Sequence, residues 1–81
     1  MAARITLIGK PSCQLCDAMR SVIQTVCDTH NLEFVELSVL DNPELAETYW
    51  LDIPVVLVDD TILSRWQVTT TQLEEALGVA S

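Results

Sequence analysis

Two cysteines separated by two residues, Cys13 and Cys16, lie where a short apolar run gives way to a helical pattern. Residues 4–8 are mostly apolar and rich in β-branched side chains, which predicts a buried strand, and residues 9–11 (Gly-Lys-Pro) predict a loop after it. Ser12 is a suitable N-cap, and apolar residues recur after it at helical spacing for about four turns. A cysteine pair at the start of a helix that follows a strand indicates redox chemistry.

Beyond this helix, which is expected to end at His30-Asn31, strand and helix patterns continue to alternate. The stretch Thr71–Glu74 fits a capping box for a last helix, and Gly78 is a suitable stop for it. Strand patterns cover residues 33–40, 55–58 and 61–64, and helix patterns cover residues 43–50 and 71–77. The order βαβ-α-ββα predicts an α/β fold with a four-stranded mixed sheet flanked by helices, in which the last two strands form a hairpin. We expect a single domain over residues 1–81.

The composition of the chain argues against several classes of function. Its 81 residues carry a formal net charge of −8 and include only four lysine and arginine residues. Nucleic acid binding depends on basic side chains that displace counterions, so we expect no nucleic acid partner. No apolar run reaches the roughly 20 residues of a membrane-spanning helix, and the N-terminus lacks the pattern of a secretory signal. We therefore expect a cytoplasmic monomer without membrane association, whose three cysteines do not form a structural disulfide framework.

The spacing of Cys13 and Cys16 allows their sulfurs to bond across the first helical turn. The partial positive charge and free N–H groups at a helix N-terminus favour a thiolate on Cys13, which we predict to be the nucleophile. Cys16 lies on the same helical face as later apolar residues, so it should point inward and act as the resolving cysteine. Lys10 adds positive potential near Cys13, whereas the charge of Asp17 opposes a thiolate there.

Two other interpretations of the pair are a structural role and half of a zinc site. Zinc usually takes four ligands, and the further candidates, Cys27 and His30, lie about two to four turns along the helix at a pitch of about 5.4 Å. A zinc site would therefore need a second chain, and we predict no metal site within one chain. Cys27 belongs to the apolar series of its helix and is expected to pack in the core. His30 ends that helix, and we assign it no catalytic role.

Three separated features give the chain a resemblance to the thioredoxin superfamily. They are the motif Lys10-Pro11-Ser12-Cys13-Gln14-Leu15-Cys16, the segment Ile53-Pro54-Val55 and the hairpin that this segment opens. The chain resembles glutaredoxins more closely, and most of all a group of short bacterial glutaredoxin-like proteins. With that group it shares Leu15-Cys16-Asp17 and, after the hairpin, Arg65-Trp66. The resemblance covers about residues 4–77, and it is specific because the features occur in order within one topology.

The resemblance implies that Pro54 is cis and lies beside the cysteine pair, and that Ile53 binds substrate backbone as an added strand. Trp66 follows the hairpin close to the expected position of the redox loop. A role in covering the core is the other interpretation of Trp66, as it is of Trp50. The predicted substrate-binding residues are Lys10, Leu15, Ile53, Pro54 and Trp66.

Two departures from the glutaredoxin pattern concern glutathione. Gln14-Leu15 stands between the cysteines in place of Pro-Tyr, and Ser64-Arg65-Trp66 replaces a Gly-Gly pair followed by an acidic residue. Bulky residues restrict the close backbone approach that glycines permit. Glutathione is therefore a candidate reductant for this protein and not an implied requirement.

These observations predict a thiol-disulfide oxidoreductase that exchanges dithiol and disulfide through Cys13 and Cys16. Its partners would be a protein or small-molecule disulfide substrate and a cellular thiol reductant. No bound cofactor is expected apart from the redox-active disulfide itself. The alternative is a binding module of the same fold, or a carrier of a metal or an iron-sulfur cluster, without redox turnover.

Overall fold

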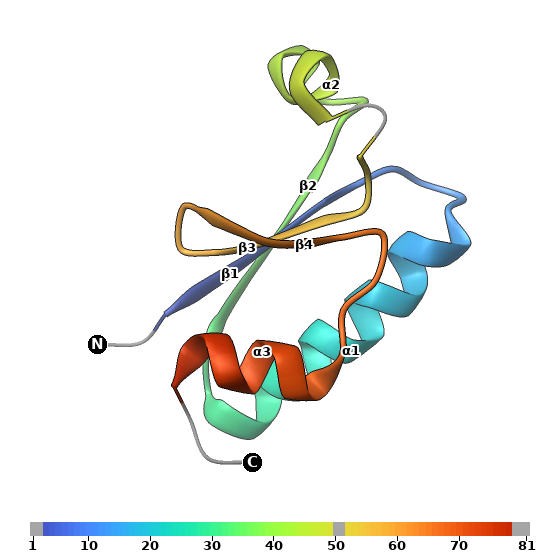
Figure 1. The fold of residues 1–81 in the computed structure, drawn as a ribbon. Helices are drawn as coiled ribbons and strands as arrows, with labels where there is room; N and C mark the ends of the chain where they lie inside the picture. The colour runs from blue at the N-terminus through green and yellow to red at the C-terminus, as the bar shows by residue number, and fades with distance from the viewer. Residues whose placement is uncertain (1–2, 50–51, 79–81) are drawn as a thin grey trace.

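The strands of the protein form one sheet in the order β2-β1-β3-β4 (Figure 1). The computed structural model describes residues 3–49 and 52–78. In chain order the elements are β1 (Arg4–Gly9), α1 (Gln14–His30), β2 (Glu33–Ser38), α2 (Pro43–Tyr49), β3 (Val55–Val58), β4 (Thr61–Arg65) and α3 (Thr70–Leu77). The predicted order of strands and helices, and with it the mixed four-stranded sheet, is confirmed.

Strand β1 is an inner strand of this sheet. It pairs with β2 in parallel and with β3 in antiparallel orientation, and β4 completes a hairpin with β3. An inner strand covered on both faces has apolar residues on both, and accordingly Ile5, Leu7 and Ile8 are buried. Ile8, near the end of β1, lies opposite Val55, the first residue of β3. The end of β1 and the start of β3 therefore share one end of the sheet.

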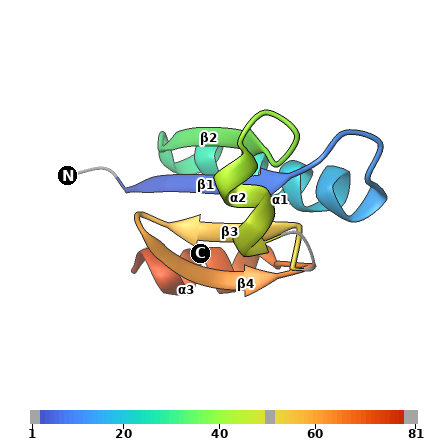
Figure 2. The ribbon, with the colours of Figure 1, turned by 90° about the horizontal axis from the view of Figure 1, so that it is seen from above.

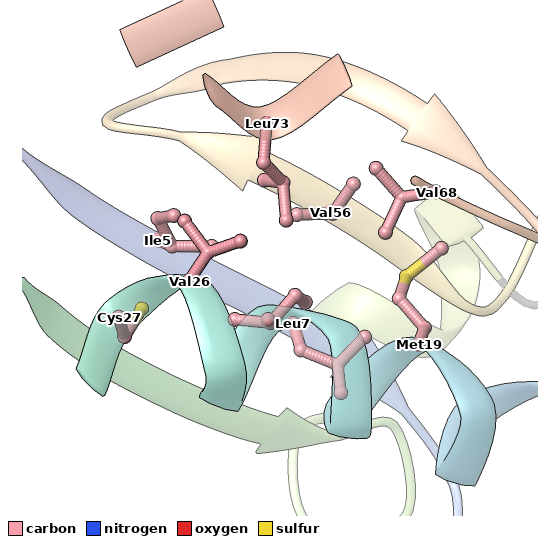
Figure 3. Packing of buried hydrophobic residues seen from close by; sticks show 9 residues of the cluster. Ile5, Leu7, Met19, Val26, Cys27, Val56, Val68 and Leu73 are labelled. Atoms are coloured by element: carbon pink, nitrogen blue, oxygen red, sulfur yellow. The ribbon is translucent and has the colours of Figure 1, made fainter. Parts of the chain in front are cut away.

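Helices cover the two faces of the sheet unequally (Figure 1, Figure 2). α1 and α3 pack on one face, while α2 lies against the other. Because successive side chains of a strand point to opposite faces, Leu7 joins the larger cluster under α1 and α3 and Ile8 joins the smaller one near α2. The larger cluster (Figure 3) has the buried residues Ile5, Leu7, Met19, Ile23, Val26, Cys27, Val56, Val68 and Leu73. The smaller one has Ile8, Val39 and Val55.

Helix α1 starts one residue later than the sequence predicts. Its N-cap is Cys13 and not Ser12, because Cys13 has an extended backbone (φ −123°, ψ 113°) and its sulfur accepts the backbone N–H of Cys16 at 3.1 Å. Ser12 instead has a left-handed backbone with φ 57°. The helix ends as predicted, with Asn31 as a left-handed cap whose N–H donates to the carbonyl of Cys27.

Helix α3 starts earlier than predicted. Its N-cap is Thr69 and not Thr71, since the Thr69 hydroxyl accepts the Gln72 N–H at 3.1 Å and the Gln72 side chain accepts the Thr69 N–H at 2.9 Å. Both registers fit the capping-box pattern. The earlier one also places Val68 and Leu73, just before and just inside the helix, together in the larger buried cluster, as a hydrophobic staple requires. The predicted stop at Gly78 is confirmed.

Strand β2 ends at Ser38, two residues before the predicted end. The Ser38 carbonyl accepts the N–H of Asp41 at 3.2 Å and the side-chain amide of Asn42 at 2.8 Å, which turns the chain out of the sheet. β1 and β4 each extend one residue beyond their predicted ends. Position 50 of the predicted helix 43–50 lies outside the described residues. Within residues 3–49 and 52–78, no helix is long and apolar enough to cross a membrane.

Candidate active site

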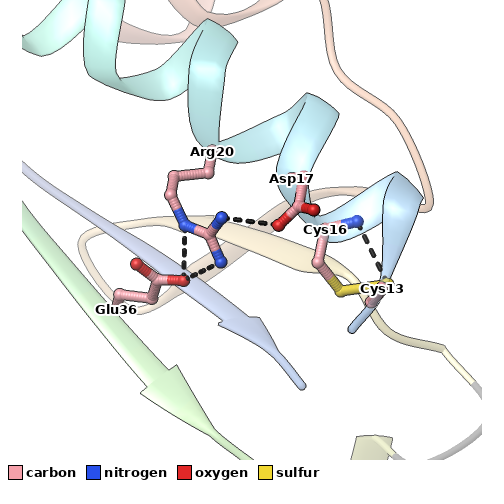
Figure 4. The surroundings of a disulfide bond; sticks show 5 residues. All are labelled: Cys13, Cys16, Asp17, Arg20 and Glu36. Atoms are coloured by element: carbon pink, nitrogen blue, oxygen red, sulfur yellow. Dashed lines mark hydrogen bonds and ion pairs between the residues drawn. A yellow bond between two sulfur atoms is a disulfide. The ribbon is translucent and has the colours of Figure 1, made fainter. Parts of the chain in front are cut away.

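Cys13 and Cys16 form a disulfide at the N-terminus of α1, with their Cα atoms 5.2 Å apart (Figure 4). Cys16 is fully buried, which confirms the predicted inward direction, whereas Cys13 is half-buried. Solvent therefore has partial access to Cys13 and no access to Cys16. Access to solvent is one of the two conditions for cysteine reactivity, and of this pair only Cys13 meets it.

The backbone of the first turn of α1 donates one hydrogen bond to the Cys13 sulfur. The left-handed Ser12 turns the chain so that Cys13 caps the helix, and the Cys16 N–H donates to the Cys13 sulfur. The N–H of Asp17 donates to the carbonyl of Cys13 at 3.0 Å and begins the helical hydrogen-bond pattern. Donors directed at a sulfur stabilise its ionised form, and the helix dipole acts in the same direction. The capping position is therefore also the position that favours a thiolate.

Gly9 is part of this site, although the sequence pattern assigned it only to a loop. It ends β1 and is buried, and a Cβ atom placed on it would lie 2.9 Å from the Cys16 sulfur and 3.3 Å from the Cys16 Cβ. Real Cβ atoms do not approach a neighbour so closely. The absence of a side chain at position 9 is thus what lets Cys16 lie against the end of β1.

Pro54 lies at the same end of the sheet as the cysteine loop. Since Ile8 pairs with Val55, the residue before Val55 is adjacent to the end of β1. The Ile53–Pro54 peptide bond is cis, the isomer that the resemblance implied, and Pro54 is fully buried. The Pro54 carbonyl accepts the N–H of Trp66 at 2.7 Å, which fixes the chain after β4 beside the start of β3.

The other predicted substrate-binding residues are distributed around this end of the molecule. Trp66 has a left-handed backbone (φ 69°) and is 52% exposed, so a large part of it faces solvent. Leu15, between the two cysteines, is 54% exposed. Ile53 is half-buried and packs against the smaller cluster. Lys10 is exposed and lines an open pocket together with Arg20. Trp50 lies outside the described residues.

Arg20 connects the first turns of α1 to β2 beside the disulfide (Figure 4). Its guanidinium donates to Asp17 from Nη1 at 2.7 Å and to Glu36 from Nε at 2.7 Å, with a further ion pair from Nη2 to the same Glu36 oxygen. The hydrogen bonds to Glu36 and then to Asp17 raise the pKa of Arg20 above its usual range. Asp17, expected to oppose a thiolate, is thus bound to a cation. No sequence motif indicated this pairing.

Cys27 and His30 belong to the packing of the far end of α1. Cys27 is a buried free thiol in the larger cluster, which confirms the prediction of a core role. Burial raises the pKa of the Cys27 thiol, and the charge of Asp28 adds to the rise. The Nε2 atom of His30 lies 2.9 Å from a carboxylate oxygen of Glu74 and so links α1 to α3. In the part of the chain that the structure describes, no three His, Cys, Asp or Glu side chains are grouped to hold a metal.

A sheet in the order β2-β1-β3-β4, helices on both faces and a cysteine pair at the start of α1 together define a redox-capable protein of thioredoxin-like fold. The glutaredoxin-like domain family (DUF836) matches residues 4–78, and the chain belongs to this family.

Solved structures of low sequence identity share the fold. The protein Ne2328 from Nitrosomonas europaea matches with a TM-score of 0.80 at 18% identity, over 95% of this chain and 93% of that one. A protein from X. campestris matches with a TM-score of 0.74 at 22% identity, over 95% and 99% of the two chains. Thioredoxin 1 from Thermosipho africanus matches with a TM-score of 0.65 at 21% identity, over 93% and 94%. At such identities the likeness establishes the fold alone.

Proposed function

We propose that the protein is a glutaredoxin-like thiol-disulfide oxidoreductase whose working groups are Cys13 and Cys16. The observation that carries the proposal is the asymmetry of the pair. The Cys13 sulfur caps α1 and accepts a backbone N–H, while the Cys16 sulfur is fully buried within bonding distance of it. An accessible, stabilised nucleophile next to a protected second thiol is the arrangement that disulfide exchange requires.

In the proposed reaction the Cys13 thiolate attacks one sulfur of a substrate disulfide. A new bond forms between that sulfur and Cys13, and the other substrate sulfur leaves with the electron pair of the broken bond and takes up a proton. Cys16 then loses its proton and attacks the Cys13 sulfur, which releases the second substrate thiol. The substrate gains two electrons and two protons, and the protein is left with its Cys13–Cys16 disulfide. A cellular thiol, for which glutathione is a candidate, would restore the dithiol by the reverse exchange.

Substrate is proposed to bind along the Pro54 segment, with Leu15 and Trp66 as exposed apolar contacts and Lys10 as a cation nearby. An added strand needs free backbone groups before Pro54. The N–H of Ile53 already donates to the carbonyl of Tyr49 at 3.1 Å. The proposed pairing therefore uses the Ile53 carbonyl as acceptor for a substrate N–H.

The physiological setting is likewise a proposal. A dithiol with this role fits a reducing compartment such as the cytoplasm, with the protein acting as a monomer. The formal charge of −8 favours partners with a basic surface through electrostatic steering. The proposed partners are therefore disulfide substrates and thiol reductants that reach the protein by diffusion, and they do not include nucleic acid or a membrane.

Replacement of each cysteine in turn tests the mechanism. With a cystine-bridged model peptide as substrate, we expect Cys16→Ser to accumulate a protein–peptide mixed disulfide on Cys13, because the resolving thiol is missing. Cys13→Ser should fall to the uncatalysed rate and form no adduct. Cys27→Ala is the control and should turn over like the unaltered protein, since that thiol is buried. Intact mass and peptide release measure all three.

Unchanged turnover in Cys13→Ser would contradict the proposed mechanism. Stoichiometric zinc or the colour of an iron-sulfur cluster in freshly purified protein, together with no exchange, would favour the carrier function instead.

A further inference from the structure

The charges beside the disulfide form a compact group of one cation and two anions. Asp17 directly follows Cys16 and lies in the same helical turn as Cys13, whose carbonyl accepts its N–H. Glu36 projects from β2, next to β1 in the sheet. Arg20 lies between the two carboxylates and binds both (Figure 4). Without the guanidinium, Asp17 and Glu36 would lose the cation that binds both of them.

An arginine suits this position better than a lysine. Its planar guanidinium presents several N–H groups in a fixed arrangement, so one side chain can bind Asp17 through Nη1 and Glu36 through Nε and Nη2 at the same time. The two carboxylates come from different elements, 16 residues separating Arg20 from Glu36. The arrangement therefore exists only when α1 is docked on the sheet.

We propose that Arg20 is a positioning residue for the redox pair, which holds the charge of Asp17 away from Cys13 and so makes the Cys13–Cys16 disulfide easier to reduce. This inference rests on the proposed function. Reduction adds two electrons and two protons to the disulfide, and one proton is released again when Cys13 ionises. Nearby uncompensated carboxylates destabilise that thiolate. By compensating them, Arg20 stabilises the reduced form relative to the disulfide.

The side chains of this group are partly exposed, with 38% exposure for Arg20, 64% for Asp17 and 42% for Glu36. Solvent and salt therefore screen their charges. The effect of Arg20 on the redox equilibrium should accordingly be modest, and it should decrease as ionic strength rises. A purely structural tie between α1 and β2 would change stability and leave the redox equilibrium where it was.

Arg20→Met is the direct test, and Arg4→Met is its matched control. Arg4 also forms an exposed ion pair, with Glu33 at 2.8 Å, but at the opposite end of β1 from the cysteine loop. In glutathione buffers at low salt, we expect Arg20→Met to lower the equilibrium constant for reduction of Cys13–Cys16 about two- to fivefold, the range of exposed ion pairs. That change corresponds to about 10 to 20 mV at about 30 mV per tenfold. Arg4→Met should leave the constant unchanged.

Two further variants separate charge from packing. Arg20→Lys keeps the positive charge and should recover most of the lost equilibrium constant. The double variant Arg20→Met/Asp17→Asn also removes the Asp17 carboxylate that Arg20 compensates. Its equilibrium constant for reduction should therefore lie closer to that of the unaltered protein than the constant of Arg20→Met does.

A lowered melting temperature of Arg20→Met with an unchanged equilibrium constant for reduction would overturn the inference. An Arg4→Met protein whose equilibrium constant falls as much as that of Arg20→Met would overturn it as well. If the unaltered protein forms no reversible Cys13–Cys16 disulfide in any buffer, the proposed function fails first. The two failures are therefore distinguishable in one series of samples.

Discussion

The two ends of α1 carry the same residue type in opposite environments. At the first turn, the half-buried Cys13 caps the helix and its sulfur accepts a backbone N–H. Near the last turn, Cys27 is 2% exposed inside the larger cluster, and burial raises the pKa of its thiol. Cysteine reactivity depends on thiolate formation and access, and the helix supplies both at one end and denies both at the other. Position along the helix therefore separates the redox group from the packing group.

The largest expected effect comes from a substitution at Gly9, which lies against Cys16 at the first turn of α1. Gly9→Ala places a Cβ 2.9 Å from the Cys16 sulfur, so the strand end or the cysteine must shift. We expect a loss of about 1–3 kcal/mol in the free energy of unfolding, as for overpacked sites. We also expect a changed equilibrium constant for Cys13–Cys16 in glutathione buffers.

Gly78→Ala is the matched variant for this prediction. Gly78 has φ +72° and open space around its Cβ position, so an alanine there is strained only through its backbone, by about 1–2 kcal/mol. It should lower stability and leave the redox equilibrium unchanged. A Gly9→Ala protein with the same redox equilibrium as Gly78→Ala would show that the Gly9 contact does not control the pair.

The raised pKa of Cys27 provides a smaller test at the other end of α1. Since the folded-state pKa lies above the value of about 8.5 in an unfolded chain, the unfolded state loses this proton first as pH rises. The contribution of the Cys27 thiol to the free energy of unfolding is fully present below about pH 8.5 and is lost as pH rises through the folded-state pKa. The expected slope is at most about 1.4 kcal/mol per pH unit.

Urea unfolding of the oxidised protein between pH 7 and pH 10 measures this slope, because the disulfide keeps Cys13 and Cys16 from titrating. Cys27→Ala should show a shallower decline than the unaltered protein in this range. Parallel curves for the two proteins would mean that Cys27 titrates alike in the folded and unfolded states, and the contrast between the helix ends would lose its electrostatic basis.

Local patterns predicted most of the fold because they depend on neighbours in the chain. The strand before the cysteines, the stops at Asn31 and Gly78 and the inward direction of Cys16 and Cys27 all follow from periodicity and backbone preference. The start of α2 at Pro43 was also predicted, but the starts of α1 and α3 were not. Several residues before α1 and before α3 are chemically able to cap the helix, and the choice of Cys13 and Thr69 depends on how each helix packs.

The parts of the site that were missed are contacts between distant segments. The closeness of Gly9 to the Cys16 sulfur follows from how α1 docks on the end of β1. The bond from Arg20 to Glu36 depends on the position of β2 beside β1 and under α1. A single sequence lists the residues that make such contacts, but it does not show which strands pair, or in which register, and so does not show which distant residues meet. The left-handed backbone of Trp66, whose N–H donates to the Pro54 carbonyl, likewise was not predicted.

The redox equilibrium of Cys13 and Cys16 tests the central claim most directly. The protein would be incubated in graded glutathione or dithiol buffers, alkylated and measured by intact mass. We predict a reversible loss of two hydrogens confined to Cys13 and Cys16, with a midpoint between about −270 and −180 mV, the range of thioredoxins, glutaredoxins and disulfide isomerases. Absence of that bond at every buffer composition would contradict a redox function for this protein.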